Sequence, residues 1–277
     1  MKKLVIITAA VIFTVVPSLH AMESFANSVV NYTAGSGVGS FTNPNAALGK
    51  PGALAGSSVF SPFNPHFQPS QLARIGEGGS LTLQLENFVI VAPGVRELGI
   101  WENIGLADTA FPNGTAGAPA TVFGADSAIV EVSADNVSWF QVNGGLPVFF
   151  TLPGNYYANS TGAFTASAPA VPVLADFGKP FTGMLSDFNG QTYGQVLATL
   201  DGSAGGTWLD LDSTGLAQVG FVRFSGLAPG QTLEIDAVGI NGSLIGAAVP
   251  EPGVAGLLVA ASGLCLGLRR ARGTRSA

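Results

Sequence analysis

Very few side chains between residues 22 and 250 have types that could carry out chemistry. That stretch contains one histidine, His66, and no cysteine, because the only cysteine of the chain is Cys265. A cysteine–histidine pair is therefore impossible there, and a serine triad would have to use His66. His66 lies in a segment rich in Pro, Asn and Phe, and the sequence contains no Gly-x-Ser-x-Gly motif. We expect a protein that is not an enzyme, with His66 exposed or packed within its loop.

Oxygen ligands are the best candidates for a metal site. They are Glu102, Asn103, Asp210 and Asp212. Ca²⁺ binds several carboxylate and carbonyl oxygens at about 2.4 Å, and loops at the edge of a sandwich can supply them. The alternative, which the pattern favours, is that Asp210 and Asp212 lie on one solvated strand face, since residues i and i+2 point the same way. Ca²⁺ is the one cofactor that the sequence suggests, because a zinc site lacks ligands.

Aromatic side chains offer a second kind of chemistry, the stacking of rings on sugars. Trp101 and Trp139 fall within strand patterns, which favours burial. Trp208, beside Gly205 and Gly206, is the strongest stacking candidate. Paired carboxylates such as Asp210 and Asp212 could also serve a glycosidase, but a sequence gives no separation between such groups.

Short strands must position these residues. Leu81, Leu83 and Leu85 alternate with polar residues, the period-2 pattern of a half-buried strand. Further strands are expected at Phe88–Val91, Leu98–Trp101, Ala128–Val132, Val137–Val142, Val148–Leu152, Val219–Phe224 and Leu233–Ile240.

The strands and their spacing predict an all-β fold, a β-sandwich or jelly roll. Turn residues separate the strands, at 134–136 and at 228–230 among other places. A parallel α/β sheet would need amphipathic helices of ten or more residues between strands, and no such pattern is convincing. No repeat of fixed period is visible, which disfavours a propeller or solenoid. We expect a body without helices.

Charge excludes one class of partner. Residues 22–250 carry sixteen acidic and five basic side chains, a net charge of −11. No basic stripe is available to follow a phosphate backbone, which argues against nucleic acid. Such acidity suits a soluble surface protein or one that meets divalent cations.

Residues 1–21 have the form of a secretion signal. Two lysines precede the apolar run Leu4–Val16, and Ala21 stands at a cleavage point for signal peptidase. Cleavage after Ala21 is the first choice, and cleavage after Ala26 is the alternative.

The last residues, 249–277, form a three-part tail. Val249, Pro250, Glu251 and Pro252 precede an uncharged apolar run, Gly253–Leu268, and a basic cluster of Arg269, Arg270 and Arg272 follows. Sixteen helical residues extend about 24 Å, and flanking arginines can stretch the span by snorkelling. The arginines favour a cytoplasmic C-terminus. The sequence thus predicts a hydrophobic helix that enters the membrane.

This tail resembles the PEP-CTERM sorting signal of Gram-negative bacteria in all three of its parts. The resemblance implies recognition by an exosortase, a membrane cysteine peptidase that releases or transfers its substrate to the cell exterior. The protein would cross the inner membrane, contact the membrane transiently through its tail and reach the cell surface or extracellular matrix.

The body also resembles a domain that recurs in PEP-CTERM and related surface proteins. The resemblance implies a sandwich over 47–248, similar to discoidin or carbohydrate-binding jelly rolls, after a loop-rich segment at 22–46. Relatives often have an Asp where this chain has Arg96-Glu97. The matching pieces, in family order, are 47–52, 76–83, 99–103, 128–135, 209–212, 222–224 and 234–238.

Together these features predict a non-enzymatic exported protein of the exopolysaccharide or biofilm matrix. One alternative is a carbohydrate-binding module with a defined sugar site, which a sugar array would reveal. A second is a hydrolase of matrix polysaccharides, which a turnover assay would expose.

Overall fold

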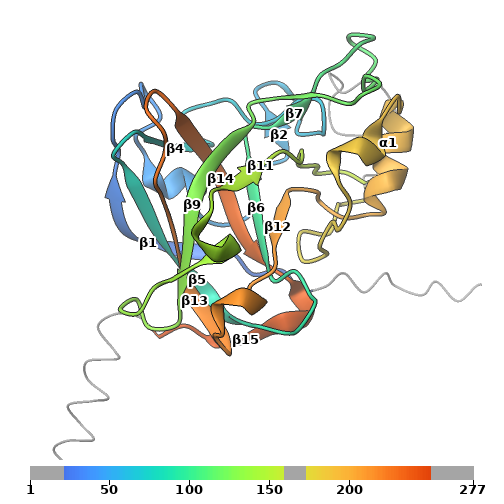
Figure 1. Cartoon of the computed structure of the whole chain (residues 1–277). Coiled ribbons are helices and arrows are strands. Elements are labelled where there is room, and N and C mark those ends of the chain that lie inside the picture. Colours follow the sequence, from blue (N-terminus) through green and yellow to red (C-terminus); the bar gives the residue numbers. More distant parts are fainter. Residues whose placement is uncertain (1–21, 159–172, 251–277) are drawn as a thin grey trace, which may run out of the picture.

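The computed structural model describes residues 22–158 and 173–250. Over these residues the chain forms mainly antiparallel strands, arranged in two larger sheets (Figure 1). The expected all-β, sandwich-like fold is therefore confirmed. The predicted signal peptide and C-terminal hydrophobic helix lie outside the described residues.

The first sheet has seven strands. In space they follow the order β1-β5-β13-β9-β10, while β11 pairs with β9 and β15 pairs with β5. Their bounds are β1 Ala26–Thr33, β5 Ser80–Ile90, β9 Asp126–Ser133, β10 Phe140–Gln141, β11 Val148–Phe150, β13 Gln218–Ser225 and β15 Ile245–Ala248.

The second sheet has four strands in the order β12-β6-β14-β4. Their bounds are β4 Ala73–Gly76, β6 Leu98–Glu102, β12 Thr207–Leu209 and β14 Thr232–Ile240. Two small hairpins stand apart from the sheets: β2 Leu54–Ala55 with β3 Ser58–Val59, and β7 Gly105–Leu106 with β8 Val122–Phe123.

The main core lies between the two large sheets. Alternate residues of each strand point the same way, so Leu81 and Leu83 of β5 meet Ile100 of β6 and Ile235 of β14 in one buried cluster. These four side chains are at most 1% exposed. Removal of this apolar surface from water is the main force that holds the sheets together.

A second cluster covers the opposite face of the four-stranded sheet. Trp101 of β6 and Ala237 of β14 pack there against Phe60 and against the helix α1, Tyr193–Leu200. Figure 1 shows α1 beyond β12, on the side away from the first sheet. All five residues of β6 are consequently buried, so this strand forms a rigid base for whatever lies at its ends.

The expectation of a body without helices is wrong. The helix α1 begins after Thr192, whose backbone N–H donates to the Gln195 side chain at 2.9 Å, and ends at Asp201, which adopts a left-handed conformation. Single 3₁₀ turns are also present: η1 Pro44–Ala47, η2 Val142–Gly145, η3 Leu185–Phe188, η4 Asp212–Thr214 and η5 Gly242–Leu244.

Two strand boundaries also differ from expectation. The segment 22–46, expected to be loop-rich, contains the eight-residue strand β1 at the edge of the first sheet. The expected strand Val137–Val142 shrinks to β10 followed by η2. The reason is that the Asp135 carboxylate takes the backbone N–H groups of Val137 and Ser138 at 2.9 and 2.8 Å, which closes a turn instead of a ladder.

Candidate functional site

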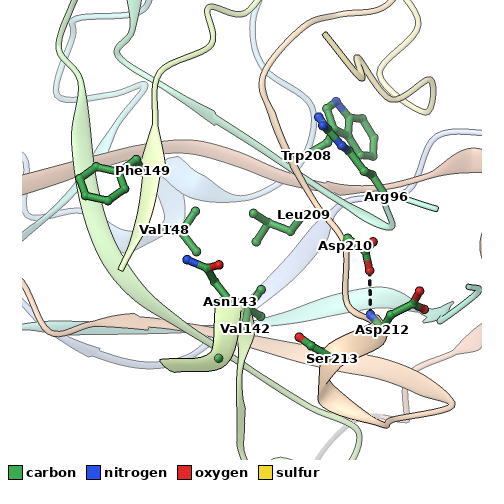
Figure 2. Close-up of a pocket in the computed structure, with 11 residues that line it drawn as sticks. Arg96, Val142, Asn143, Val148, Phe149, Trp208, Leu209, Asp210, Asp212 and Ser213 are labelled. Atoms are coloured by element: carbon green, nitrogen blue, oxygen red, sulfur yellow. Dashed lines mark hydrogen bonds between the residues drawn. The ribbon is translucent and has the colours of Figure 1, made fainter. Parts of the chain in front are cut away.

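A pocket of about 620 Å³ lies beside the first residue of β6 (Figure 2). We call it the Asp210 pocket. Its volume falls within the range of about 300–1,000 Å³ that is typical of ligand sites. It is lined by Arg96, Val142, Asn143, Gly144, Val148, Phe149, Trp208, Leu209, Asp210, Asp212 and Ser213.

Strand pairing brings the polar side of this pocket together. β12 runs antiparallel to β6, and Leu209 lies opposite Leu98. The next residues outward are therefore Asp210 on one segment and Glu97 on the other. The alternative in which Asp210 and Asp212 share one strand face is wrong, because β12 ends at Leu209 and the turn η4 begins at Asp212.

The Glu97 carboxylate joins the two segments that form the polar side. Its side chain is fully buried, with 0% exposure. One oxygen accepts the backbone N–H of Ala92 and the other accepts the backbone N–H of Leu211, each at 2.9 Å. Burial raises the pKa of Glu97, and these two N–H donors oppose the rise. A single carboxylate thus fixes the segments that carry Arg96 and Asp210.

The two aspartates reinforce this clamp. Oδ2 of Asp212 accepts the backbone N–H of Gly94 at 2.7 Å, and Oδ1 of Asp210 accepts the backbone N–H of Asp212 at 2.9 Å. Gly94 has a φ of +69°, in the left-handed region, and its N–H points to Asp212 from this turn. The conformation favours glycine, because a residue with a Cβ would be strained there. Both aspartates remain exposed at the rim of the pocket.

Arg96 has an unusual charge environment. Four of the five basic side chains in the described residues form ion pairs: Lys50–Glu23, Arg74–Glu234, Lys179–Asp201 and Arg223–Glu131. Arg96 is the fifth, and no described carboxylate forms an ion pair with it. Its Nη1 donates to the carbonyl oxygen of Phe181 at 3.1 Å, and its own carbonyl accepts from the Asn241 side chain at 2.9 Å. The backbone of Arg96 is fixed while most of its guanidinium donors stay available.

Phe149 supplies an apolar wall. It belongs to β11, where Val148 and Phe150 point into the core and Phe149 points outward with 70% exposure. Figure 2 shows its ring on one side of the pocket, with Asp210 and Asp212 on the other. Phe149 is not among the predicted site residues, although strand alternation within Val148–Leu152 places it on the outer face.

Trp208 lines the same pocket but offers little ring surface. It is only 4% exposed, its indole N–H donates to the Gly205 carbonyl at 2.9 Å, and it packs edge-on against Trp101. Of the two other tryptophans, Trp101 is fully buried and Trp139 lies beneath the guanidinium of Arg223, 4.2 Å from ring centroid to Cζ. The exposed ring in this pocket is therefore that of Phe149.

The predicted oxygen ligands do not come together. Glu102 is the last residue of β6, about 16 Å along the strand from Glu97, so Glu102 and the half-buried Asn103 lie far from Asp210 and Asp212. Within residues 22–158 and 173–250, no three His, Cys, Asp or Glu side chains are arranged to hold a metal ion. Ca²⁺ binding stays a prediction.

Glu102 itself is an isolated buried carboxyl group. It is 4% exposed, and neither of its oxygens has a hydrogen-bond partner among the described residues. Burial raises its pKa well above the ordinary value, and the charges of Asp126 and Glu234 add to the rise. Glu102 therefore keeps its proton far more readily than an exposed glutamate does.

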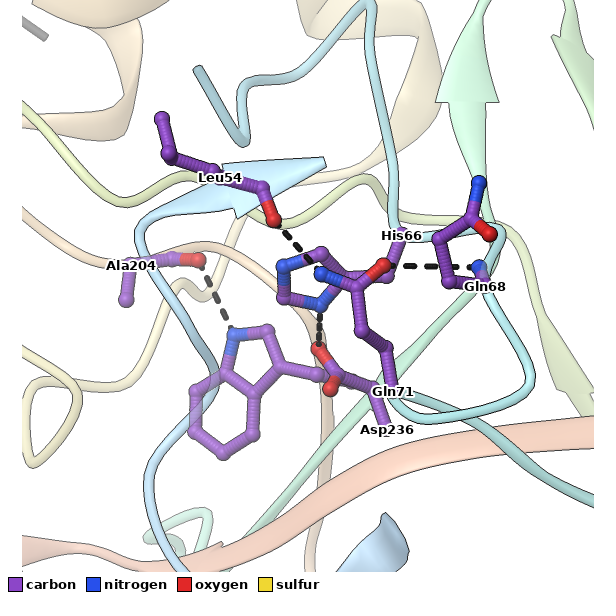
Figure 3. Close-up of polar contacts among 7 residues, drawn as sticks. Leu54, His66, Gln68, Gln71, Ala204 and Asp236 are labelled. Carbon is purple, nitrogen blue, oxygen red and sulfur yellow. Dashed lines mark hydrogen bonds and ion pairs between the residues drawn. The ribbon is translucent and has the colours of Figure 1, made fainter. Parts of the chain in front are cut away.

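His66 is neither exposed nor confined to its own loop. It is 0% exposed, and its Nδ1 lies 2.8 Å from Oδ2 of Asp236 on β14, a contact that ties the loop to the second sheet (Figure 3). The imidazole stacks on Phe60 at 4.3 Å between ring centroids, and its Nε2 has no described partner. The geometry fits a structural link, because no solvent reaches the ring.

The start of the predicted sorting motif is part of the folded body. Val249 is 7% exposed and belongs to the main core, and its backbone N–H donates to the Glu86 carbonyl at 3.0 Å. Pro250 is the last described residue. The rest of the motif, Glu251 and Pro252, lies outside the described residues, as do the cleavage residue Ala21 and the basic cluster Arg269, Arg270 and Arg272.

Comparisons with known proteins give no family. No model of a known protein family matches this chain, and no curated protein is similar to it. Among the described helices, none combines the length and the apolar character that a bilayer crossing requires.

Proposed function

We propose that this chain is a non-enzymatic exported surface or matrix protein whose sandwich binds a polysaccharide in the Asp210 pocket. One observation carries the proposal: an exposed aromatic ring, Phe149, lines the same pocket as the polar groups of Arg96, Asp210 and Asp212. A pyranose ring has an apolar C–H face and an edge of hydroxyl groups. The pocket offers a partner for each, apolar contact at Phe149 and hydrogen bonds opposite.

Binding is favoured over hydrolysis by the placement of the carboxylates. A glycosidase needs two carboxyl groups on either side of the scissile bond, about 5–10 Å apart. Asp210 and Asp212 are two positions apart on the same side, and each uses one oxygen to hold a backbone N–H. His66, the single histidine of the described residues, is buried and paired with Asp236.

Export is supported by the two ends of the sequence. The signal-like segment 1–21, the motif at 250–252 and the arginine cluster favour secretion followed by processing through an exosortase. On this proposal the body is a jelly roll similar to discoidin or carbohydrate-binding modules. Its setting is the exopolysaccharide or biofilm matrix.

A polysaccharide array tests the binding function, followed by titration calorimetry on the exported protein purified from producing cells. We expect Phe149→Ala to weaken binding about tenfold, because the apolar contact is lost. Phe111→Ala is the matched control, since Phe111 is 74% exposed and does not line the pocket. Equal losses in both variants, or release of reducing sugar during incubation, would contradict the proposal.

Intact mass of the exported protein tests the sorting route. We expect a mature form that begins at residue 22 and lacks the apolar run Gly253–Leu268. A surface form that keeps this run would refute processing by an exosortase.

A further inference from the structure

We infer that the Asp210 pocket selects a neutral sugar and binds two adjacent hydroxyl groups between the guanidinium of Arg96 and the carboxylates of Asp210 and Asp212. This inference depends on the proposed function and specifies its ligand class. Two observations support it: the hydrogen-bond donors and acceptors in the pocket that no described residue occupies, and the signs of the charges on Arg96, Asp210 and Asp212.

Donors come from Arg96. A guanidinium has five N–H groups, and the contact with the Phe181 carbonyl at 3.1 Å uses one of its nitrogens. The other basic side chains of the described residues are held by carboxylates. Arg96 is thus the one cation of the described residues that forms no ion pair with a described carboxylate, and it lines the Asp210 pocket, where its remaining N–H groups can donate charge-assisted hydrogen bonds to a ligand.

Acceptors come from the two aspartates. Each binds a backbone N–H through a single oxygen, at 2.7 Å for Asp212 and 2.9 Å for Asp210. An ionised carboxylate has about four acceptor positions, so each aspartate keeps most of its capacity. A sugar hydroxyl both donates and accepts, and two adjacent hydroxyls therefore match a donor group beside an acceptor group.

The donors and acceptors are held in place before any ligand arrives. The buried Glu97 fixes the segments at 92 and 211, and Asn241 fixes the carbonyl of Arg96 at 2.9 Å. Side chains on fixed segments lose less conformational entropy on binding, which favours affinity for a rigid sugar ring.

Charges of either sign are disfavoured in a ligand. A carboxylate sugar that reaches Arg96 also approaches Asp210 and Asp212, and like charges at close range oppose binding. The body as a whole carries −11, which repels a polyanion at longer range. An amino sugar that reaches the aspartates approaches Arg96 instead. A neutral sugar uses both groups without either penalty.

A matched series of β-1,4-linked hexamers tests this inference on the exported protein: cellohexaose, its glucosamine analogue and its glucuronate analogue. Maltohexaose and laminarihexaose add two further neutral linkages. We expect at least one neutral hexamer to bind, with a Kd that changes less than about threefold between 20 and 500 mM NaCl. The charged hexamers should bind at least tenfold more weakly than the tightest neutral hexamer.

The outcomes separate the two proposals. If a charged hexamer binds more tightly than every neutral one, neutral selection is wrong while sugar binding stands. If no hexamer and no array polysaccharide binds, the proposed function itself is wrong, and this inference with it.

Charge variants identify the residues responsible. The double variant Asp210→Asn, Asp212→Asn keeps oxygen acceptors but removes both charges, so the penalty against glucuronate should shrink at least fivefold. Arg96→Gln should weaken neutral binding and shrink the penalty against glucosamine. Asp135→Asn is the control, because Asp135 also holds a turn through backbone N–H groups but does not line the pocket. If the penalties against glucuronate and glucosamine stay within about twofold of their wild-type values in both pocket variants, the assignment is wrong.

Discussion

The strand β6 has a buried glutamate at each end. One of the two carboxyl groups accepts hydrogen bonds, and the other has no hydrogen-bond partner among the described residues. Glu97 precedes the strand, is 0% exposed and binds two backbone N–H groups, one through each oxygen. Glu102 ends the strand, is 4% exposed and has no hydrogen-bond partner among the described residues. Both carboxyl groups have a raised pKa because burial penalises the charged form. Burial alone therefore does not decide what such a group does.

The hydrogen-bond partners of each carboxyl group decide whether it stabilises the fold. At Glu97 the carboxylate satisfies two backbone donors that would otherwise lack partners, and it fixes the two segments of the Asp210 pocket. At Glu102 the group satisfies no described donor, so it weakens the end of the sandwich where it lies. The end of β6 that fixes the Asp210 pocket is therefore the end at which the buried carboxylate has hydrogen-bond partners.

The largest expected effect is that of Glu97→Ala. The buried N–H of Leu211 and the partly buried N–H of Ala92 would both lose their acceptor. A buried donor without a partner costs about 1–3 kcal/mol and a partly buried one costs less, so we expect the free energy of unfolding to fall by about 3 kcal/mol. Urea unfolding followed by tryptophan fluorescence measures the change. The stability of Glu97→Gln should lie between that of the wild type and that of Glu97→Ala, because an amide retains one acceptor oxygen. A loss below 1 kcal/mol in Glu97→Ala would show that the clamp contributes little.

The pH dependence of stability probes the opposite end of β6. Burial, together with the charge of Glu234, raises the pKa of Asp126 from 3.8 to about 7. The folded state then binds a proton between about pH 4 and pH 7 that the unfolded state has released. The free energy of unfolding should therefore fall as the pH rises through this window and level off above it. The full shift corresponds to about 4 kcal/mol, and because Asp126 is only partly buried, screening by solvent reduces the expected fall to about 2 kcal/mol.

The variant Asp126→Asn isolates this effect. An asparagine does not titrate, so the slope of stability against pH between 4 and 7 should become shallower than in the wild type. Denaturant midpoints at pH 4.5, 6 and 7.5 provide the comparison. A slope of the opposite sign in the wild type, with stability rising through the window, would contradict the raised pKa.

Glu102→Leu should have a smaller effect, and of opposite sign to Glu97→Ala. Replacement of an unpartnered buried carboxyl by an apolar side chain of similar size removes a desolvation cost, so we expect a gain of about 1–2 kcal/mol at pH 7.5. The same substitution at Glu97 should be strongly destabilising. Thermal unfolding of Glu97→Leu and Glu102→Leu measures this contrast. If both substitutions change the stability in the same direction, the prediction is wrong.

Sequence reasoning predicted the central strands because their side chains repeat with period 2. Leu81, Leu83 and Leu85 are all buried as expected, and β9, β13 and β14 lie close to their predicted ranges. The expectation of a half-buried strand is wrong for this part of β5, because Thr82 and Gln84 are buried too. The helix α1 was missed although Tyr193, Val196, Leu197 and Leu200 follow a helical spacing, since eight residues are short for such a pattern.

The pocket was only partly predictable. Asp210 and Asp212 stood out by type, and Arg96 stood out as a departure from the resembled family. The role of Glu97 could not be read from the sequence, because its partners are backbone N–H groups, and that of Leu211 lies 114 positions away. The grouping of Asp210 with Arg96 depends on the antiparallel register of β12 and β6, which no local pattern encodes.

Phe149→Ala should have the smallest effect on stability. It is also the sharpest test of whether the pocket beside Glu97 binds a sugar. Its ring is 70% exposed, so its removal should change the free energy of unfolding by less than about 0.5 kcal/mol. Glu97→Gln should lower both stability and sugar affinity, because it loosens the polar side of the pocket. Phe149→Ala should lower affinity alone, since the segments at 92 and 211 keep their clamp. Calorimetric titration and thermal unfolding on the same samples separate the two cases. If Phe149→Ala lowers the melting temperature as much as Glu97→Gln does, the Phe149 ring contributes to the core. The proposal that this ring is a ligand contact would then be wrong.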